Sequence, residues 1–211
     1  MAPITLLDAV GLPVVKMPSF EENPEVHYPL SLAQWIQGEG FFRFHVLRVI
    51  REKFNPTEKD IADWLMQSPA FKPERRPLLE HGIRAYLDED HVTALHVLLP
   101  QIEEAARTAA GLKGDSIFEW KPNRDGVRHL DARSLNQVLD SPGLSGLIGT
   151  NHIMYMRVAL VMHQGLNLRN RVAHGLMLPQ EFNRGISEIA LECLLILGQL
   201  RATKGASDTE G

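Results

Sequence analysis

The sequence predicts an all-α fold, a bundle of helices that carries one small β-hairpin. Apolar residues recur at the three- to four-residue spacing of helices over 30–54, 91–112 and 180–201. The second of these stretches has an apolar stripe wide enough to face the core of a bundle. The stripe consists of Ala94, Leu95, Leu98, Leu99, Ile102, Ala106 and Ala109 or Ala110. Between 116 and 130 the spacing breaks, and Asp125-Gly126 is a dipeptide typical of hairpin turns.

Prolines and glycines divide the N-terminal part of the chain. Residues 1–29 hold five prolines, which interrupt regular helices, so we expect an irregular arm there. Residues 30–72 are expected to form helices that pack on the main domain. Gly38 and Gly40 are expected to divide the first of these helices, and Thr57 is a plausible cap for the next.

The main helical domain is predicted over residues 73–204. It begins with a helix at 74–87, and acidic residues 88–90 then precede the longest helix, where negative charge suits the positive end of a helix dipole. Pro100 inside that helix predicts a kink. Further helices are expected over 132–139, 148–166 and 180–201. Residues 205–211 are expected to form a flexible tail.

The composition is that of an ordinary globular protein. The 211 residues are 44% hydrophobic and 23% charged, which suits one large domain or one domain with a helical extension. With a net charge of −4 the protein surface is not basic as a whole, so any contact with nucleic acid would need a local cluster of basic residues. The single cysteine, Cys193, cannot form an intrachain disulfide and fits a reducing compartment. No signal peptide or membrane span is evident, so we expect a soluble, cytoplasmic protein.

The most informative motif is Asn-Leu-Arg-Asn-Arg-Val-Ala-His-Gly at 167–175. Arg169, Asn170 and His174 resemble the signature of HEPN domains, in which an arginine, usually followed by a polar residue, stands four to six residues before a histidine. The run Arg-Asn-x-x-x-His-Gly is similar to one uncharacterised branch of that superfamily. The resemblance implies a helical bundle with its functional centre at this motif.

An upstream segment adds to the resemblance. That branch often carries Pro-Gln-x-Glu and then an arginine on a long helix, and this chain has Pro-Gln-Ile-Glu at 100–103 followed by Arg107. The resemblance covers about residues 75–200. The spacing alone is weak evidence, because Arg76 and His81 share it elsewhere in the chain. The asparagine, the closing glycine and the upstream glutamate distinguish the 167–175 motif.

The resemblance implies an endoribonuclease that needs no metal or cofactor and cleaves RNA in a cleft shared by a homodimer. If 167–175 is helical, Asn170 and His174 lie on one face a turn apart, with Arg169 beside them. His174 would be the general acid or base, and Arg169 would stabilise charge on the phosphoryl oxygens. Asn170 would orient the histidine or the phosphate. Supporting partners or phosphate contacts are expected from Asn167, Arg171, Glu103 and Arg107.

A non-catalytic interpretation stays open, because a fold does not determine a function. Arg169 and Asn170 would then tie neighbouring helices together, with an internal salt bridge from Glu103 to Arg169. The chain would be a module for dimerisation, for RNA or nucleotide binding, or for binding a partner protein. Under the catalytic interpretation it is a toxin or defence effector, and an antitoxin would be its partner.

Other candidate sites are less favoured. His91 and His96 lie five residues apart, which does not place two metal ligands on one helix face, so no metal site is expected. Cys193 is expected in the core. Three glycines at 143–149 follow no strand, which argues against a phosphate loop. The best local basic cluster is Lys121, Arg124, Arg128 and His129, for which a solvated loop is favoured over an RNA guide.

Overall fold

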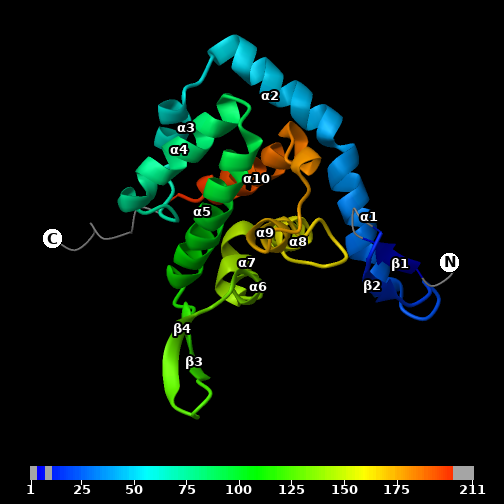
Figure 1. The fold of residues 1–211 in the computed structure, drawn as a ribbon. Coiled ribbons are helices and arrows are strands. Elements are labelled where there is room, and N and C mark those ends of the chain that lie inside the picture. Colours follow the sequence, from blue (N-terminus) through cyan, green and yellow to red (C-terminus); the bar gives the residue numbers. More distant parts are fainter. Residues whose placement is uncertain (1–3, 8–10, 202–211) are drawn as a thin grey trace.

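The computed structural model describes residues 4–7 and 11–201, and within them the chain is mostly helical, with short antiparallel strands (Figure 1). The strands are β1 (Ile4–Leu7), β2 (Pro13–Met17), β3 (Phe118–Pro122) and β4 (Arg128–Ala132). The helices are α1 (Pro24–Gly38), α2 (Gly40–Phe54), α3 (Glu58–Leu65), α4 (Arg76–Leu87), α5 (His91–Gly111), α6 (Leu135–Leu139), α7 (Pro142–Ile148), α8 (Thr150–Leu160), α9 (Leu168–Ala173) and α10 (Arg184–Gly198). Short 3-10 turns lie at Pro73–Arg75 and Pro179–Glu181. The predicted all-α class with a small hairpin is confirmed.

Helix α5 is the centre of the bundle, packed against α4 and α10 (Figure 1). Every position of its predicted apolar stripe is buried, and Leu95, Leu98 and Ile102 are completely so. Each such side chain contributes about 1.5–3 kcal/mol by leaving water. The helix runs from His91 to Gly111 with Pro100 inside it. None of the described helices is both long and apolar enough to cross a membrane.

Local capping signals place the helix starts as predicted. Thr57 Oγ1 accepts a hydrogen bond from the Asp60 N–H at 3.3 Å, and Asp60 Oδ2 accepts one from the Thr57 N–H at 2.8 Å, a reciprocal capping box that starts α3. Asp90 Oδ1 accepts from the Thr93 N–H at 3.0 Å and starts α5. These side chains satisfy amides that the first helical turn leaves unpaired.

The structure differs from the predicted irregular arm at 1–29. Over the described residues, β1 and β2 pair antiparallel, and α1 already begins at Pro24. Proline fits the first turn of a helix because the amide that it lacks has no partner there. Pro29 lies inside α1 without ending it. The predicted tail at 205–211 lies outside the described residues.

The helix pattern after the hairpin also differs from the prediction. The helix expected over 132–139 is shortened to α6, and the one expected over 148–166 ends at Leu160. Helix α7 was not predicted. Its start is capped by Ser141 Oγ, which accepts from the Leu144 N–H at 3.2 Å, so the dipeptide Ser-Pro was the signal that sequence reasoning missed.

The hairpin β3–β4 is confirmed. Its turn is held by Asn123 Oδ1, which accepts from the Asp125 and Val127 amides, each at 2.9 Å. Gly126 there has φ +78°, a left-handed conformation that glycine adopts without strain. Lys121, from the predicted basic cluster, is ion-paired with Glu119 and Asp131 on the hairpin. These pairs neutralise part of the cluster.

Helices α1 and α2 form an arm along the outside of the bundle (Figure 1). The predicted division between Gly38 and Gly40 is confirmed, and two backbone hydrogen bonds continue across it. The Glu39 N–H donates to Trp35 O at 2.8 Å, and the Arg43 N–H donates to Glu39 O at 3.0 Å. Arg43 Nε also donates to Glu192 Oε2 on α10 at 2.8 Å, which attaches the arm to the bundle.

Stability should fall as pH rises from about 10 to about 12. Burial, together with the nearby Glu188 carboxylate, raises the pKa of Tyr86 to about 12, whereas an unfolded tyrosine ionises near 10. The unfolded tyrosine therefore loses its proton first, so the stability that this group contributes is complete below pH 10 and declines by about 2 kcal/mol as pH reaches 12. Urea midpoints at pH 8–12 measure this. Tyr86→Phe should make the decline smaller by that amount, while Tyr155 and Cys193, whose pKa values burial also raises, still contribute to it. An identical decline in both proteins would contradict the assignment.

Candidate functional site

The motif predicted to be functional forms α9 and its two flanking residues. Asn167 precedes the helix with φ +51°, and Gly175 follows with φ +66°, both in the left-handed region. Asparagine is among the few residues that tolerate this region, and glycine after a helix is a common stop signal. The helix therefore occupies Leu168–Ala173, shorter than the nine-residue segment considered from the sequence.

The loop before α9 is held tightly against α8. The Leu166 N–H donates to Val158 O at 2.8 Å, and a side chain on Gly165 would collide with that same carbonyl. Leu168 and Val172 anchor α9 from within, since both are buried. The backbone that presents the motif is therefore set by packing against α8.

Arg169 joins α9 to α5 through Glu103. Its Nε donates to Glu103 Oε2 at 3.0 Å, and its Nη1 donates to Asn170 Oδ1 at 3.2 Å. The other Glu103 oxygen accepts from Arg107 Nη2 at 3.0 Å. The two segments that carry the family resemblance thus meet in space at Glu103. The salt bridge expected under the non-catalytic interpretation is formed.

A row of amide contacts continues from Asn170. Its Nδ2 donates to Asn167 Oδ1 at 2.7 Å, and Asn167 Nδ2 lies 3.3 Å from Nδ1 of His163. Sequence reasoning did not select His163 as a site residue. The contact is local in sequence, since His163 lies four residues before Asn167, but it is made in the loop after α8 and not within a helix.

His174 lies at the C-terminal end of α9. Its backbone N–H donates to Asn170 O at 3.0 Å, which places the two residues one helical turn apart, as predicted. The residue is exposed, and within the described part of the chain its ring makes no hydrogen bond. The imidazole is therefore accessible to a ligand, while Arg169 and Asn170 beside it are half-buried and held.

The remaining cations around the motif are paired. Arg171 Nη2 donates to Glu181 Oε1 at 2.5 Å, and Arg107 Nη1 donates to Glu104 Oε2 at 2.7 Å. Among the described contacts, Nη2 of Arg169 donates to no protein acceptor. That amino group is the part of the cluster able to bind an added oxyanion without first breaking an ion pair.

Glu103→Ala should destabilise the protein by about 1–3 kcal/mol. The carboxylate is largely buried and serves two arginines, and its loss leaves both with unpaired donors. Thermal unfolding measures the change. Glu74→Ala, at an exposed glutamate in the turn before α4, is the control and should change the melting temperature little. Equal melting temperatures for wild type and Glu103→Ala would show that the ion pairs are dispensable.

The alternative sites have structural roles. Cys193 is buried, and burial raises the pKa of its thiol well above the usual range, so it is a core side chain. His96 Nδ1 lies 2.8 Å from Val92 O, and its ring stacks on Phe182. The described residues contain no group of three or more His, Cys, Asp or Glu side chains that could hold a metal ion. Gly143 lies in α7, where its N–H donates to Asp115 Oδ2 at 2.9 Å.

No family model matches the chain, and neither a curated protein nor a solved structure matches it significantly. The likeness to HEPN domains therefore depends on Arg169, Asn170 and His174 and on the segment around Glu103.

Proposed function

We propose that the chain is a cytoplasmic, metal-independent endoribonuclease of the HEPN type, which acts as a homodimer. The observation that carries the proposal is an exposed His174 imidazole one helical turn after an anchored Arg169–Asn170 pair. A catalytic site needs positioned groups and access to substrate, and here Arg169 and Asn170 are held in place while the His174 imidazole is accessible.

In the proposed reaction the ribose 2′-hydroxyl attacks the adjacent phosphorus. The new bond joins O2′ to phosphorus, and the bond from phosphorus to O5′ breaks. His174 of one subunit takes the 2′-hydroxyl proton as a general base. The equivalent histidine of the second copy gives a proton to the leaving O5′ as a general acid. The products are a 2′,3′-cyclic phosphate and a 5′-hydroxyl end.

The other motif residues bind and position. Nη2 of Arg169 would bind the non-bridging phosphoryl oxygens, on which charge increases in the transition state. Asn170 would orient the phosphate or the histidine, with Asn167 holding its amide. Glu103 would set the plane of the arginine. Arg171 and Arg107 would contact neighbouring phosphates only by leaving their glutamates.

The test incubates purified protein with labelled RNAs in the presence of a chelator and maps the new ends. Cleavage that leaves 2′,3′-cyclic phosphate ends, and that is absent from His174→Ala, is the expected result. Intact RNA with a folded, dimeric wild type would overturn the proposal. In cells, expression of the wild type should arrest growth, as expected of a toxin or defence effector, and His174→Ala should relieve it.

A second candidate is a non-catalytic module for dimerisation or for binding RNA, a nucleotide or a partner such as an antitoxin. It is favoured by the pairing of Arg107, Arg169 and Arg171 with glutamates, which ties α5, α9 and the turn before α10 together. Such a module should show thermal stabilisation by its ligand without turnover.

A further inference from the structure

Helix α2 leaves an unusually apolar surface uncovered. It has no buried residue, although it is one of the longer helices of the chain. Trp35 at the end of α1 is 56% exposed, and Phe42, Val46 and Val49 are 64%, 57% and 52% exposed. Large apolar patches on soluble proteins mark interaction sites, whereas single exposed apolar residues do not.

These residues form a stripe along one side of the arm, which we call the seam. The seam consists of Trp35, Glu39, Phe42, Val46, Val49 and Lys53, spaced alternately four and three residues apart. This is the spacing by which one helix packs along another. Backbone hydrogen bonds at Glu39 link α1 to α2, and the two helices together are roughly 45 Å long.

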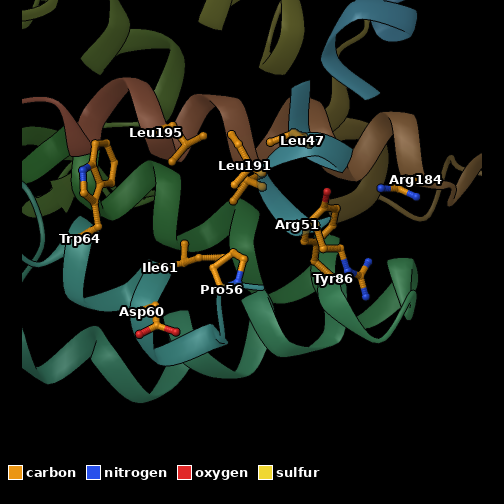
Figure 2. A pocket seen from close by; sticks show the side chains of 11 residues that line it. Leu47, Arg51, Pro56, Asp60, Ile61, Trp64, Tyr86, Arg184, Leu191 and Leu195 are labelled. Atoms are coloured by element: carbon orange, nitrogen blue, oxygen red, sulfur yellow. The ribbon is translucent and has the colours of Figure 1, made fainter. Parts of the chain in front are cut away.

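An apolar groove lies beside the seam, between α2 and α10. Two cavities of about 260 and 300 Å³ share Leu47, Leu191 and Leu195 as their lining. Figure 2 shows Leu191 and Leu195 along α10, with Leu47 of α2 close to Leu191. Trp35, Phe42 and Val46 of the seam line the second cavity. A helix laid along the seam would therefore contact both walls of this groove.

The seam exposes an apolar area of the size that marks interaction sites. Its apolar side chains, Trp35, Phe42, Val46 and Val49, are each more than half exposed. Together they expose roughly 400 Å², given the areas of aromatic and valine side chains. That lies within the roughly 300–600 Å² of the largest patch on a monomer, which is often functional. The walls of the groove would supply the rest of the roughly 800 Å² that each partner buries in a stable complex.

The two charged residues of the seam indicate which partner binds there and whether the two helices run parallel or antiparallel. Glu39 and Lys53 each lie seven residues from Val46, on either side of it, and neither makes a salt bridge among the described residues. We infer that α2 packs antiparallel on α2 of a second copy, with the twofold axis at Val46. Glu39 then faces the partner's Lys53, and the contact occurs twice. A parallel pair would instead place like charges together.

This interface is separate from the proposed catalytic face. None of the seam residues is a predicted site residue, and none of the residues that line the two cavities takes part in the Arg169–Glu103 contact. A chain that uses both faces would form an assembly larger than a dimer. The inference does not depend on ribonuclease activity, and its failure would leave that activity to be judged by RNA cleavage alone.

The first test measures the mass of the full chain by analytical ultracentrifugation. Val46→Glu should halve the mass of the wild-type assembly, because it places two carboxylates on the twofold axis. Val46 is exposed in the single chain, so folding is expected to be unaffected, and circular dichroism checks this. Glu52→Lys, an exposed charge reversal outside the seam on the same helix, should leave the mass unchanged. A monomeric wild type at high concentration, or an unchanged mass in Val46→Glu, would overturn the inference.

The second test determines the orientation by exchange of charges. Glu39→Lys and Lys53→Glu should each weaken association at least about 10-fold, because each opposes like charges in the antiparallel pair. The double variant should regain wild-type association, since it restores both opposite-charge contacts. Single variants as tight as the wild type, or a double variant as weak as the singles, would contradict the antiparallel register.

Discussion

Replacing His174 by alanine is expected to lower the rate of RNA cleavage at least about 100-fold, because positioned acid–base groups contribute about that much or more. The same change should shift the melting temperature by less than about 2 °C, since the residue is exposed and its ring holds no other described residue. Single-turnover cleavage with protein in excess measures the rate of the chemical step. Because the RNA is then fully bound, a change in RNA affinity does not alter the measured rate.

The matched control is His81→Ala, at an exposed histidine on α4 that is distant from the motif in sequence. It should cleave at the wild-type rate. Equal rates for wild type and His174→Ala would remove the histidine from the reaction. Together with Glu103→Ala, this variant separates the two interpretations of the motif. If the motif is catalytic, His174→Ala lowers the rate of RNA cleavage without lowering the melting temperature. If the motif has only a structural role, only Glu103→Ala has a measurable effect, which is a lower melting temperature.

Gly165→Ala should be the most damaging small substitution at the site, with a loss of about 2–3 kcal/mol and a melting temperature lower by roughly 5–10 °C. The added methyl group would meet the Val158 carbonyl, which is backbone and cannot rotate away. That carbonyl also accepts the Leu166 N–H, so the strain passes into the loop that positions Asn167 and α9. Differential scanning calorimetry measures the loss, and activity should decline with it.

Gly146→Ala is the control for the same chemical change. It lies in α7 with no atom within 4 Å of the added carbon, and alanine favours a helix by up to about 1 kcal/mol over glycine. A small gain in stability is therefore expected. If Gly165→Ala proved as stable as Gly146→Ala, the loop would not be constrained by Val158.

Local signals determined most of the fold before any tertiary contact was considered. The apolar spacing along α5, the Thr57–Asp60 cap and the Asp125-Gly126 turn each depend on residues a few positions apart. Interactions over such short separations are specified by the chain itself. The prolines gave a wrong prediction of an irregular arm at the N-terminus. Pro24 lies in the first turn of α1, where a helix accepts proline.

The motif was also visible locally, as one turn of helix from Asn170 to His174. Its surroundings were not. Arg169 meets Glu103 from a distance of 66 residues, and the loop before α9 is closed on α8, where a side chain at Gly165 would meet Val158 O. Likewise, the helices of 30–72 were expected to pack on the main domain, and α2 contacts it through Leu47 and Arg43 while Phe42, Val46 and Val49 stay exposed. Helical periodicity identifies an apolar face, but only the path of the whole chain decides what that face contacts.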